Sequence, residues 1–147
     1  MTGNSERKTW MGLLARAPAD DLDRLWRAAA LAPDHVRLRA PEVGAVMVRG
    51  RAGAVGAAFN LGEMVVTRCA VRLADGRVGH GHVQGRGKDH AEQAALIDAL
   101  MQGAEAAQLR AAVLDPLARA EAARRADRAG RAAATRVDFF TLVRGED

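Results

Sequence analysis

The turn Gly85-Arg-Gly-Lys88 contains the residues of this sequence that are best suited to bind an anion. Two glycines alternate there with two cations, and the periodicity that follows predicts a helix from Asp89 to about Ala107. Backbone N–H groups at the start of a helix, together with neighbouring cations, attract phosphate and similar anions. The sequence therefore predicts an anion-facing turn at Gly85, Arg86, Gly87 and Lys88. The alternative is a glycine-rich strand-to-helix turn whose cations are merely solvated.

His90 adds a titratable side chain to this turn. Helical spacing places it on the apolar face with Ala94 and Ile97, so it points toward the core or a cleft. Glu92 lies three residues after Asp89, which suits a capping box, and it faces away from His90. A core histidine and a ligand-binding histidine both fit this position, and the spacing shows no nucleophile with a nearby base. We therefore take His90 as a further anion-binding candidate and assign no catalytic residue.

The hairpin expected around Asp75-Gly76 brings together the residue types of a zinc site. With those two residues at the tip, strand pairing places Cys69 opposite His82 and on the same face as His80. Cysteine and histidine are ligands that zinc prefers. Two half-buried histidines beside an ordinary buried thiol fit the same pattern. Because no further thiol or acid is near in the sequence, no metal site is predicted.

The succession of elements predicts an α+β fold with an antiparallel sheet. Helical spacing of apolar residues predicts two N-terminal helices, over residues 5–17 and 20–32. Alternation then predicts strands over 35–40 and 46–48 with a turn at 41–44, a loop over 50–62, and a hairpin of 64–73 with 77–83. After the helix that follows, we expect a strand or turn at 109–114 and a helix from Asp115-Pro116 to about Thr135. One domain over residues 1–147 results, a hairpin or meander flanked by N-terminal and C-terminal helices.

The C-terminal third has little apolar surface of its own to bury. Its helix is mostly alanine and arginine, with Leu117 as the single large apolar residue. An extended segment over 137–144 is expected next, in which Phe139 and Phe140 point to opposite sides. Either another subunit covers one of them, or an edge strand packs one phenylalanine beneath the N-terminal helices. We take Phe139, Phe140 and Arg144 as partner-docking candidates.

Composition and charge limit the class of protein. The 147 residues contain 3% aromatic residues, so the core consists mainly of Ala, Val and Leu, and a thin core of this kind often needs a partner. The single cysteine excludes an internal disulfide. Without a secretory leader or an apolar run of membrane-spanning length, we expect a cytoplasmic protein without membrane contact. The formal charge of +4 suits phosphate ligands, nucleic acid or acidic partners, and equally an arginine-rich composition.

Several sequence blocks, spread in order over nearly the whole chain, match the pattern of a known family. The blocks are Trp10-Met-Gly-Leu-Leu-Ala15, Arg39-Ala-Pro-Glu-Val-Gly44, Phe59-Asn-Leu-Gly62, Val66-Thr-Arg-Cys-Ala-Val-Arg-Leu73, Val83-Gln-Gly-Arg-Gly-Lys-Asp-His-Ala-Glu92, Ala95-Leu-Ile-Asp-Ala-Leu100 and Arg136-Val-Asp-Phe-Phe-Thr-Leu-Val-Arg-Gly145. Together they resemble the G subunit (PhnG) of the bacterial carbon–phosphorus lyase core complex. Matched blocks in a fixed order are more specific than any single motif.

The resemblance implies a role in phosphonate breakdown. In that family the G subunit works with the H, I and L subunits to make α-D-ribose 1-methylphosphonate 5-triphosphate, as the phosphonate displaces adenine from MgATP. The J subunit carries out the later radical cleavage. The resemblance thus implies a helper subunit without a cofactor of its own, whose chief partner is the I subunit, the holder of the nucleosidase chemistry.

Two functions of other classes are also compatible with the residues alone. One is a stand-alone phosphate-ester or nucleotide enzyme centred on His90. The other is a small basic nucleic-acid binder, although the chain lacks aromatic interleaving and a recognisable reading module.

Overall fold

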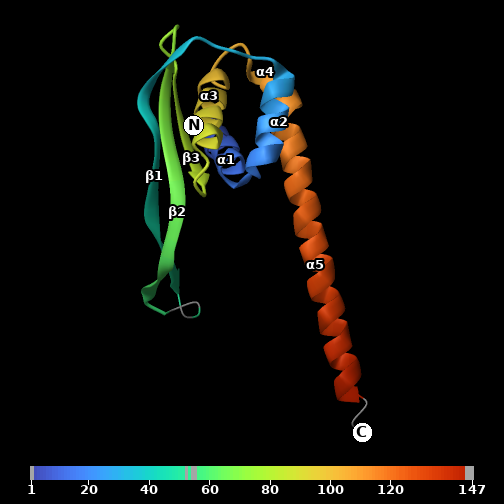
Figure 1. The fold of residues 1–147 in the computed structure, drawn as a ribbon. Helices are drawn as coiled ribbons and strands as arrows, with labels where there is room; N and C mark the ends of the chain where they lie inside the picture. The colour runs from blue at the N-terminus through green and yellow to red at the C-terminus, as the bar shows by residue number, and fades with distance from the viewer. Residues whose placement is uncertain (1, 52, 54–55, 145–147) are drawn as a thin grey trace.

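The computed structural model describes residues 2–51, 53 and 56–144, and the side chains of residue 2 and of 136–144 lie outside that description. Helices and strands follow one another in an α-β-α order (Figure 1). They are α1 (Thr2–Arg16), α2 (Ala19–Ala29), β1 (His35–Arg51), β2 (Ala58–Leu73), β3 (Val78–Gln84), α3 (Lys88–Leu100), α4 (Ala106–Leu109), the π-helical turn η1 (Arg110–Leu114) and α5 (Asp115–Arg144). The α+β class is confirmed.

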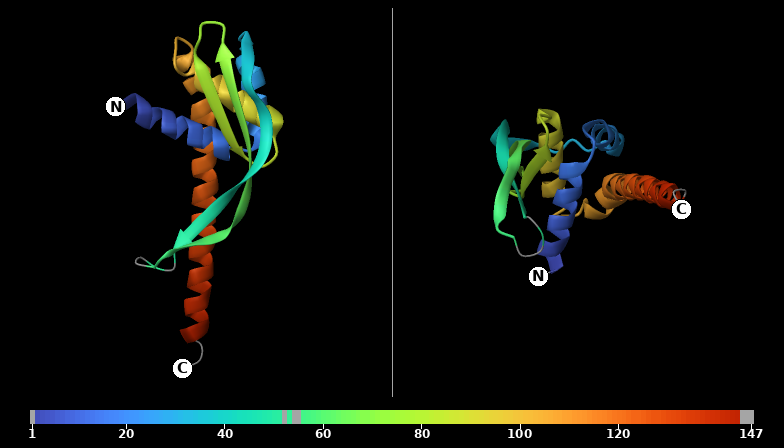
Figure 2. Two further views of the ribbon diagram at one scale, coloured as in Figure 1. Left: turned by 90° about the vertical axis from the view of Figure 1, so that its left-hand side faces the viewer. Right: turned by 90° about the horizontal axis from the view of Figure 1, so that it is seen from below.

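The strands form an antiparallel meander in the order β1-β2-β3. Helix α3 packs on one face of this sheet, α1 lies beside β3, and α2 with the first turns of α5 forms an outer layer (Figures 1 and 2). None of the helices in the described part of the chain covers the opposite face. Its uncovered side chains include Val36 and Leu38, each about half exposed.

β1 is a single long strand, so the turn predicted at 41–44 is wrong. Pairing with β2 continues from His35 opposite Leu73 to Arg51 opposite Ala58, with register shifts on both sides of Arg39. Pro41 has no N–H to give to a ladder, and a bulge accommodates such a residue without ending the strand. The loop expected over 50–62 is therefore shorter than predicted, because β1 continues to Arg51 and β2 begins at Ala58. Part of the tip between them lies outside the described residues.

The β2–β3 hairpin turns at the expected place but with a longer loop. Leu73 N donates to Arg77 O at 2.9 Å and Gly76 N to Leu73 O at 3.0 Å, so the loop has three residues and ends on Gly76, whose φ is 95°. Cys69 then pairs with Gly81, and His82 pairs with Arg68. A shift of one residue reverses the face of a side chain. The prediction that Cys69 shares a face with His80 and His82 is therefore wrong.

Two glycines of β3 allow the sheet to lie directly against α3. Gly79 and Gly81 alternate with the histidines and face the helix, where a Cβ on Gly81 would come within 2.2 Å of Ala91 O. A Cβ on Gly79 would come within 1.9 Å of Ala95 O. The alternation Val78-Gly-His-Gly-His82 thus has a packing explanation: the glycines lie under α3 and the histidines stay outside.

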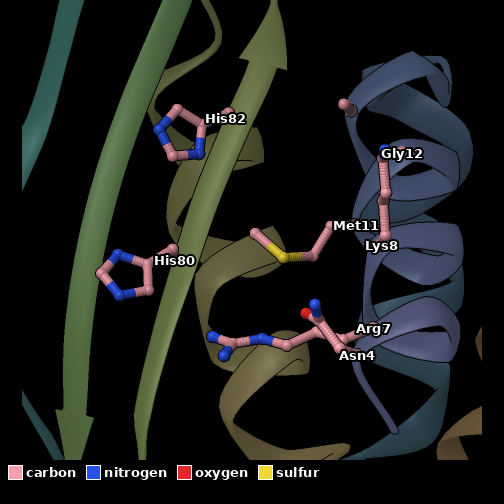
Figure 3. A pocket seen from close by; sticks show the side chains of 8 residues that line it. Asn4, Arg7, Lys8, Met11, Gly12, His80 and His82 are labelled. Carbon is pink, nitrogen blue, oxygen red and sulfur yellow. The ribbon is translucent and has the colours of Figure 1, made fainter. Parts of the chain in front are cut away.

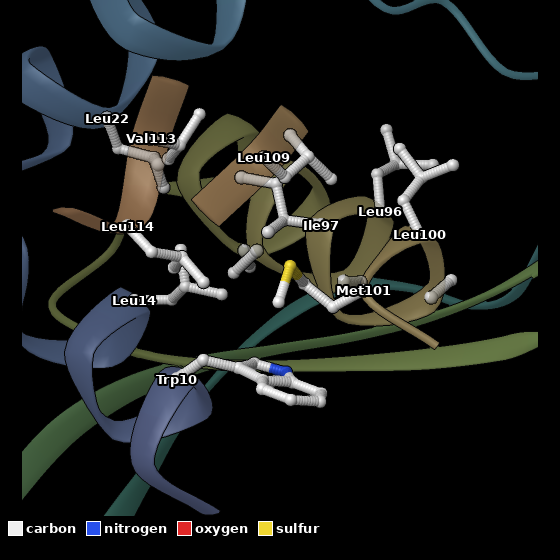
Figure 4. Packing of buried hydrophobic residues seen from close by; sticks show 14 of the residues in the cluster. Trp10, Leu14, Leu22, Leu96, Ile97, Leu100, Met101, Leu109, Val113 and Leu114 are labelled. Carbon is white, nitrogen blue, oxygen red and sulfur yellow. The ribbon is translucent and has the colours of Figure 1, made fainter. Parts of the chain in front are cut away.

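The core is built around α3, which is buried on all sides from Ala94 to Leu100. Leu14 and Leu22 approach it from α1 and α2, and Ile97 lies at its centre (Figure 4). The segment 109–114, expected as a strand or turn, is helical. Val113 and Leu114 follow Leu109 by four and five residues, and the helical turn brings all three side chains to the same face. They are buried in this core. Because the chain is already helical before Asp115, that residue does not cap α5.

α5 leaves the core after its first two turns. Leu117 is buried, Glu121 is half-buried, and residues 122–135 are exposed. The helix continues through 137–144, so the extended segment predicted there is wrong. The side chains of Phe139, Phe140 and Arg144 lie outside the described part. Within that part, no helix is long and apolar enough to cross a membrane.

Candidate functional site

The Gly85–Lys88 turn connects β3 to α3 as expected, but Asp89 does not cap the helix. Gly87 occupies the N-cap position without a side-chain cap, and Gly85, with φ of 95°, accepts from Thr67 Oγ1 at 2.7 Å through its carbonyl. The turn lines a depression of about 450 Å³ against α2. Its lining contains the cations Arg27, Arg86 and Lys88 and the carboxylates Asp20, Asp23 and Asp89. The charge of this depression is therefore mixed.

His90 is a core residue. Its side chain is buried, and Nε2 lies 2.9 Å from the carbonyl oxygen of Leu14, to which it donates. Burial lowers the pKa of His90, so the ring is neutral near pH 7. Glu92 points to another side of α3, where it accepts from His35 Nε2 at 3.0 Å and from Arg37. It joins α3 to β1 and forms no capping box.

His90→Gln is expected to remove part of the acid sensitivity of folding. Because the folded-state pKa lies below the ordinary value of 6.5, the unfolded chain binds the proton more readily. The stabilisation is then complete above pH 6.5 and is lost as the pH falls below it. The glutamine amide can still donate to Leu14. Urea unfolding at about pH 8 and about pH 5.5 should show a smaller acid-induced loss of unfolding free energy in the variant than in the parent.

His35→Gln provides the opposite control. His35 Nδ1 donates to Pro33 O and Nε2 to Glu92, so both ring nitrogens need a proton and the pKa of His35 is raised. Its stabilisation is present below pH 6.5 and is lost as the pH rises through the raised value. Its removal should increase acid sensitivity. Equal acid losses in the parent and in His90→Gln would contradict a neutral buried His90.

Asp98 is a fully buried acid that the sequence reasoning missed. Its carboxylate accepts from Arg7 Nε at 3.1 Å and Nη2 at 2.8 Å, from Trp10 Nε1 at 2.9 Å and from the backbone N of His80 at 2.9 Å. One side chain thus joins α1 and α3 to the outer edge of β3. The available signal was an acid inside the otherwise apolar run from Ala94 to Leu100.

Two depressions lined by cations adjoin the two histidines of β3 and together form a groove. A depression of about 670 Å³ lies between α1 and β3, and another of about 400 Å³ lies on the uncovered sheet face. Both are lined by His80 and His82, whose imidazoles project from β3 in the same direction (Figure 3). We call this the two-histidine groove and define it by Lys8, Met11, Arg39, Arg68, His80 and His82.

Electrostatic repulsion and partial burial both act on His82. The pKa of His82 is lowered, first by burial and then by the neighbouring His80, Arg68 and Arg39. Cys69 lies toward the α3 side with 2% of its surface exposed, and burial raises the pKa of its thiol. Within the described residues, no three His, Cys, Asp or Glu side chains are grouped so that they could hold a metal ion.

Comparison with known proteins identifies similar sequences. The model of the family described as "Phosphonate metabolism protein PhnG" matches residues 5–145. A protein of Rhizobium meliloti (strain 1021), named alpha-D-ribose 1-methylphosphonate 5-triphosphate synthase subunit PhnG, is 47% identical over 146 residues. That alignment covers 99% of this chain and 93% of the relative. The aligned region therefore spans the turn, the segments of the two-histidine groove and α5.

Proposed function

The chain belongs to the phosphonate metabolism protein PhnG family, and from that premise we propose that it is a non-catalytic subunit of an α-D-ribose 1-methylphosphonate 5-triphosphate synthase. The observation that carries this proposal is the 47% identity along 99% of the chain to a named subunit of that synthase. A subunit role in phosphonate metabolism follows from the family. That this chain alone does not catalyse the reaction is supported by the surroundings of its reactive side chains.

The side chains best suited to chemistry already have structural partners. His90 donates to Leu14, Glu92 accepts from His35 and Arg37, and Asp98 accepts from α1 and β3. Cys69 is buried as a thiol. This arrangement supports a subunit that contributes shape and charge to an assembly. We propose that MgATP is a reactant of the assembled synthase and that this chain holds no cofactor of its own.

Two projecting elements support docking to other subunits. α5 has 30 residues and would extend about 45 Å, yet it packs on the core only through its first turns (Figure 1). The distal part of the β1–β2 hairpin extends in the same direction as α5, from the other side of the fold (Figures 1 and 2), and exposes Met47, Phe59 and Leu61. A helix without a buried stripe gains stability by packing against a partner.

We propose that α5 and the distal hairpin bind neighbouring subunits of the lyase complex, chiefly the I subunit, with H, L and J in the same assembly. The exposed arginines of α5 suit an acidic surface on that partner. Phe139, Phe140 and Arg144 remain docking candidates at its end.

Reconstitution tests both the function and the docking. Adenine release from MgATP and methylphosphonate should require this chain together with the partner subunits, and the chain alone should release none. Phe139→Ala with Phe140→Ala should abolish co-purification with the I subunit, because truncation of aromatic anchors typically costs an interface about 2 kcal/mol or more each. Adenine release is measured by chromatography and association by affinity capture.

The matched control is Arg24→Ala, since the Arg24 side chain is 70% exposed on α2 and belongs to neither projecting element. Its complex should assemble as the parent does. Unchanged capture of the double phenylalanine variant would refute docking through the end of α5. Turnover by the chain alone, lost in His90→Gln, would instead establish the stand-alone enzyme.

A further inference from the structure

We infer that the two-histidine groove binds a phosphorus oxyanion, the phosphonate or polyphosphate group of a synthase substrate. Geometry and charge define the site, and the identity of the ligand rests on the proposed function. The groove is distinct from the depression at the Gly85–Lys88 turn, whose lining comes from α2, the turn and the start of α3.

The backbone of β3 fixes the two histidines as a pair. Gly79 and Gly81 face α3, so His80 and His82 project together from the opposite face. Residues two apart in a strand lie about 7 Å from each other. The N–H of His80 is held by the buried carboxylate of Asp98 at 2.9 Å. Two imidazoles at this spacing can donate to oxygens of one oxyanion or of two neighbouring phosphates.

Cations from three further elements line the two depressions that share this pair of histidines. Lys8 comes from α1, Arg39 from β1 and Arg68 from β2. Arg68 takes part in no ion pair among the residues that the structure describes, and its guanidinium fork matches the geometry of phosphate oxygens. Glu42 approaches Arg39 at 3.7 Å, but both side chains are more than half exposed, which makes the pair weak.

The absence of acids in the lining separates this groove from the turn. Neither of its two depressions is lined by an aspartate or glutamate of the described residues. Three aspartates line the depression beside Arg86 and Lys88. An oxyanion is therefore attracted to the two-histidine groove with less opposing charge, although both places carry several cations.

Size and lining favour a small phosphorylated molecule over a macromolecule. The depressions of about 670 and 400 Å³ fall in the range of small-ligand sites. Met11 and Ala15 provide apolar surface beside the cations. The described lining holds no Phe, Tyr or Trp on which a nucleic-acid base could stack.

Because His82 titrates, the affinity of the groove for an oxyanion should depend on pH. His80, Arg68 and Arg39 oppose protonation of His82, and Lys8 and Arg7 face the same region from α1. A bound dianion would offset this repulsion and favour the imidazolium. Binding should therefore take up protons and tighten as the pH falls from about 8 to about 6.

Calorimetric titration of the full chain with tripolyphosphate, and separately with methylphosphonate, tests the site. Arg68→Gln with His82→Gln should weaken binding about tenfold or more, because charge-assisted hydrogen bonds are removed. The two probes separate a polyphosphate site from a phosphonate site. Arg24→Gln, which removes one exposed cation from α2, should bind as the parent does.

Three outcomes would overturn the inference: no binding of either probe to the parent at millimolar concentration, equal affinity in the groove variant, or a loss only in Arg86→Gln with Lys88→Gln. The reconstituted synthase distinguishes this failure from failure of the proposed function. If adenine release requires the chain but the groove variant keeps the parental KM, the groove inference fails alone. If the chain binds tripolyphosphate through the groove but adenine release does not require it, the subunit function fails alone.

Discussion

Gly81→Ala is expected to destabilise the fold strongly. A Cβ at this position would lie 2.2 Å from Ala91 O and 3.0 Å from Ala95 N, both of them backbone atoms of α3. A backbone carbonyl cannot rotate out of the way as a flexible side chain can, so the whole helix must move off the sheet. Overpacking of a core typically costs about 1–3 kcal/mol, and we expect at least the upper end here. That is a large part of the total stability of a domain, about 5–15 kcal/mol.

Circular dichroism during urea and thermal unfolding measures this effect. Gly44→Ala is the matched control, because Gly44 lies in β1 and a Cβ there meets nothing within 4 Å. It should leave stability nearly unchanged. Gly79→Ala should behave like Gly81→Ala, since its Cβ would lie within 1.9 Å of Ala95 O. Similar melting temperatures for Gly81→Ala and Gly44→Ala would show that β3 and α3 lie farther apart than in this structure.

Asp98→Ala is expected to be the most destabilising substitution of a charged residue. It leaves the guanidinium of Arg7, the indole N–H of Trp10 and the backbone N–H of His80 without their acceptor. Removal of one partner from a buried ion pair costs about 3–5 kcal/mol. The Arg7 side chain is 34% exposed and can regain water, so we expect a value near the lower end, about 3 kcal/mol.

A second measurement separates the specific role of Asp98 from general destabilisation. Hydrogen exchange at the His80 amide should accelerate more than exchange at other β3 amides, because Asp98 accepts directly from it. Asp127→Ala on α5 is the control. Asp127 pairs with Arg131 at 2.8 Å, but both side chains are more than 60% exposed, and such pairs contribute little. Retained protection of the His80 amide in Asp98→Ala would contradict the network.

Periodicity predicted the class and most elements of this fold, and the errors have identifiable physical causes. The alternation of Val65, Thr67, Cys69 and Val71 was strong enough to predict β2. The register of the next hairpin was not readable, because Asp75-Gly76 fits both a two-residue loop and the three-residue loop that the structure has. Only the burial of Gly79 and Gly81 against α3 decides between them. The sequence shows these glycines but not the helix that approaches them.

In the candidate sites, too, local spacing was predictable and long-range contacts were not. Helical spacing predicted that His90 points inward and that Glu92 lies on another face, and both are confirmed. The partners of Asp98 come from positions far apart in sequence, so no local pattern could indicate them. The two-histidine groove was likewise unpredictable, because Lys8, Arg39 and Arg68 reach it from elements far apart in the sequence. The helical state of 137–144 competes with a local preference of Val and Phe for strands.

β1 has a consequence for the behaviour of the chain outside its assembly. It is an edge strand of 17 residues, and long open edges recruit strands from other copies and start aggregation. Pro41 and the register shifts around Arg39 interrupt the first half of that edge. The stretch Gly44–Val48 has no such interruption and includes exposed Val46 and Met47. Aggregation of the isolated protein should therefore begin in the distal half of the β1–β2 hairpin. A subunit bound there would cover the exposed strand edge and prevent it.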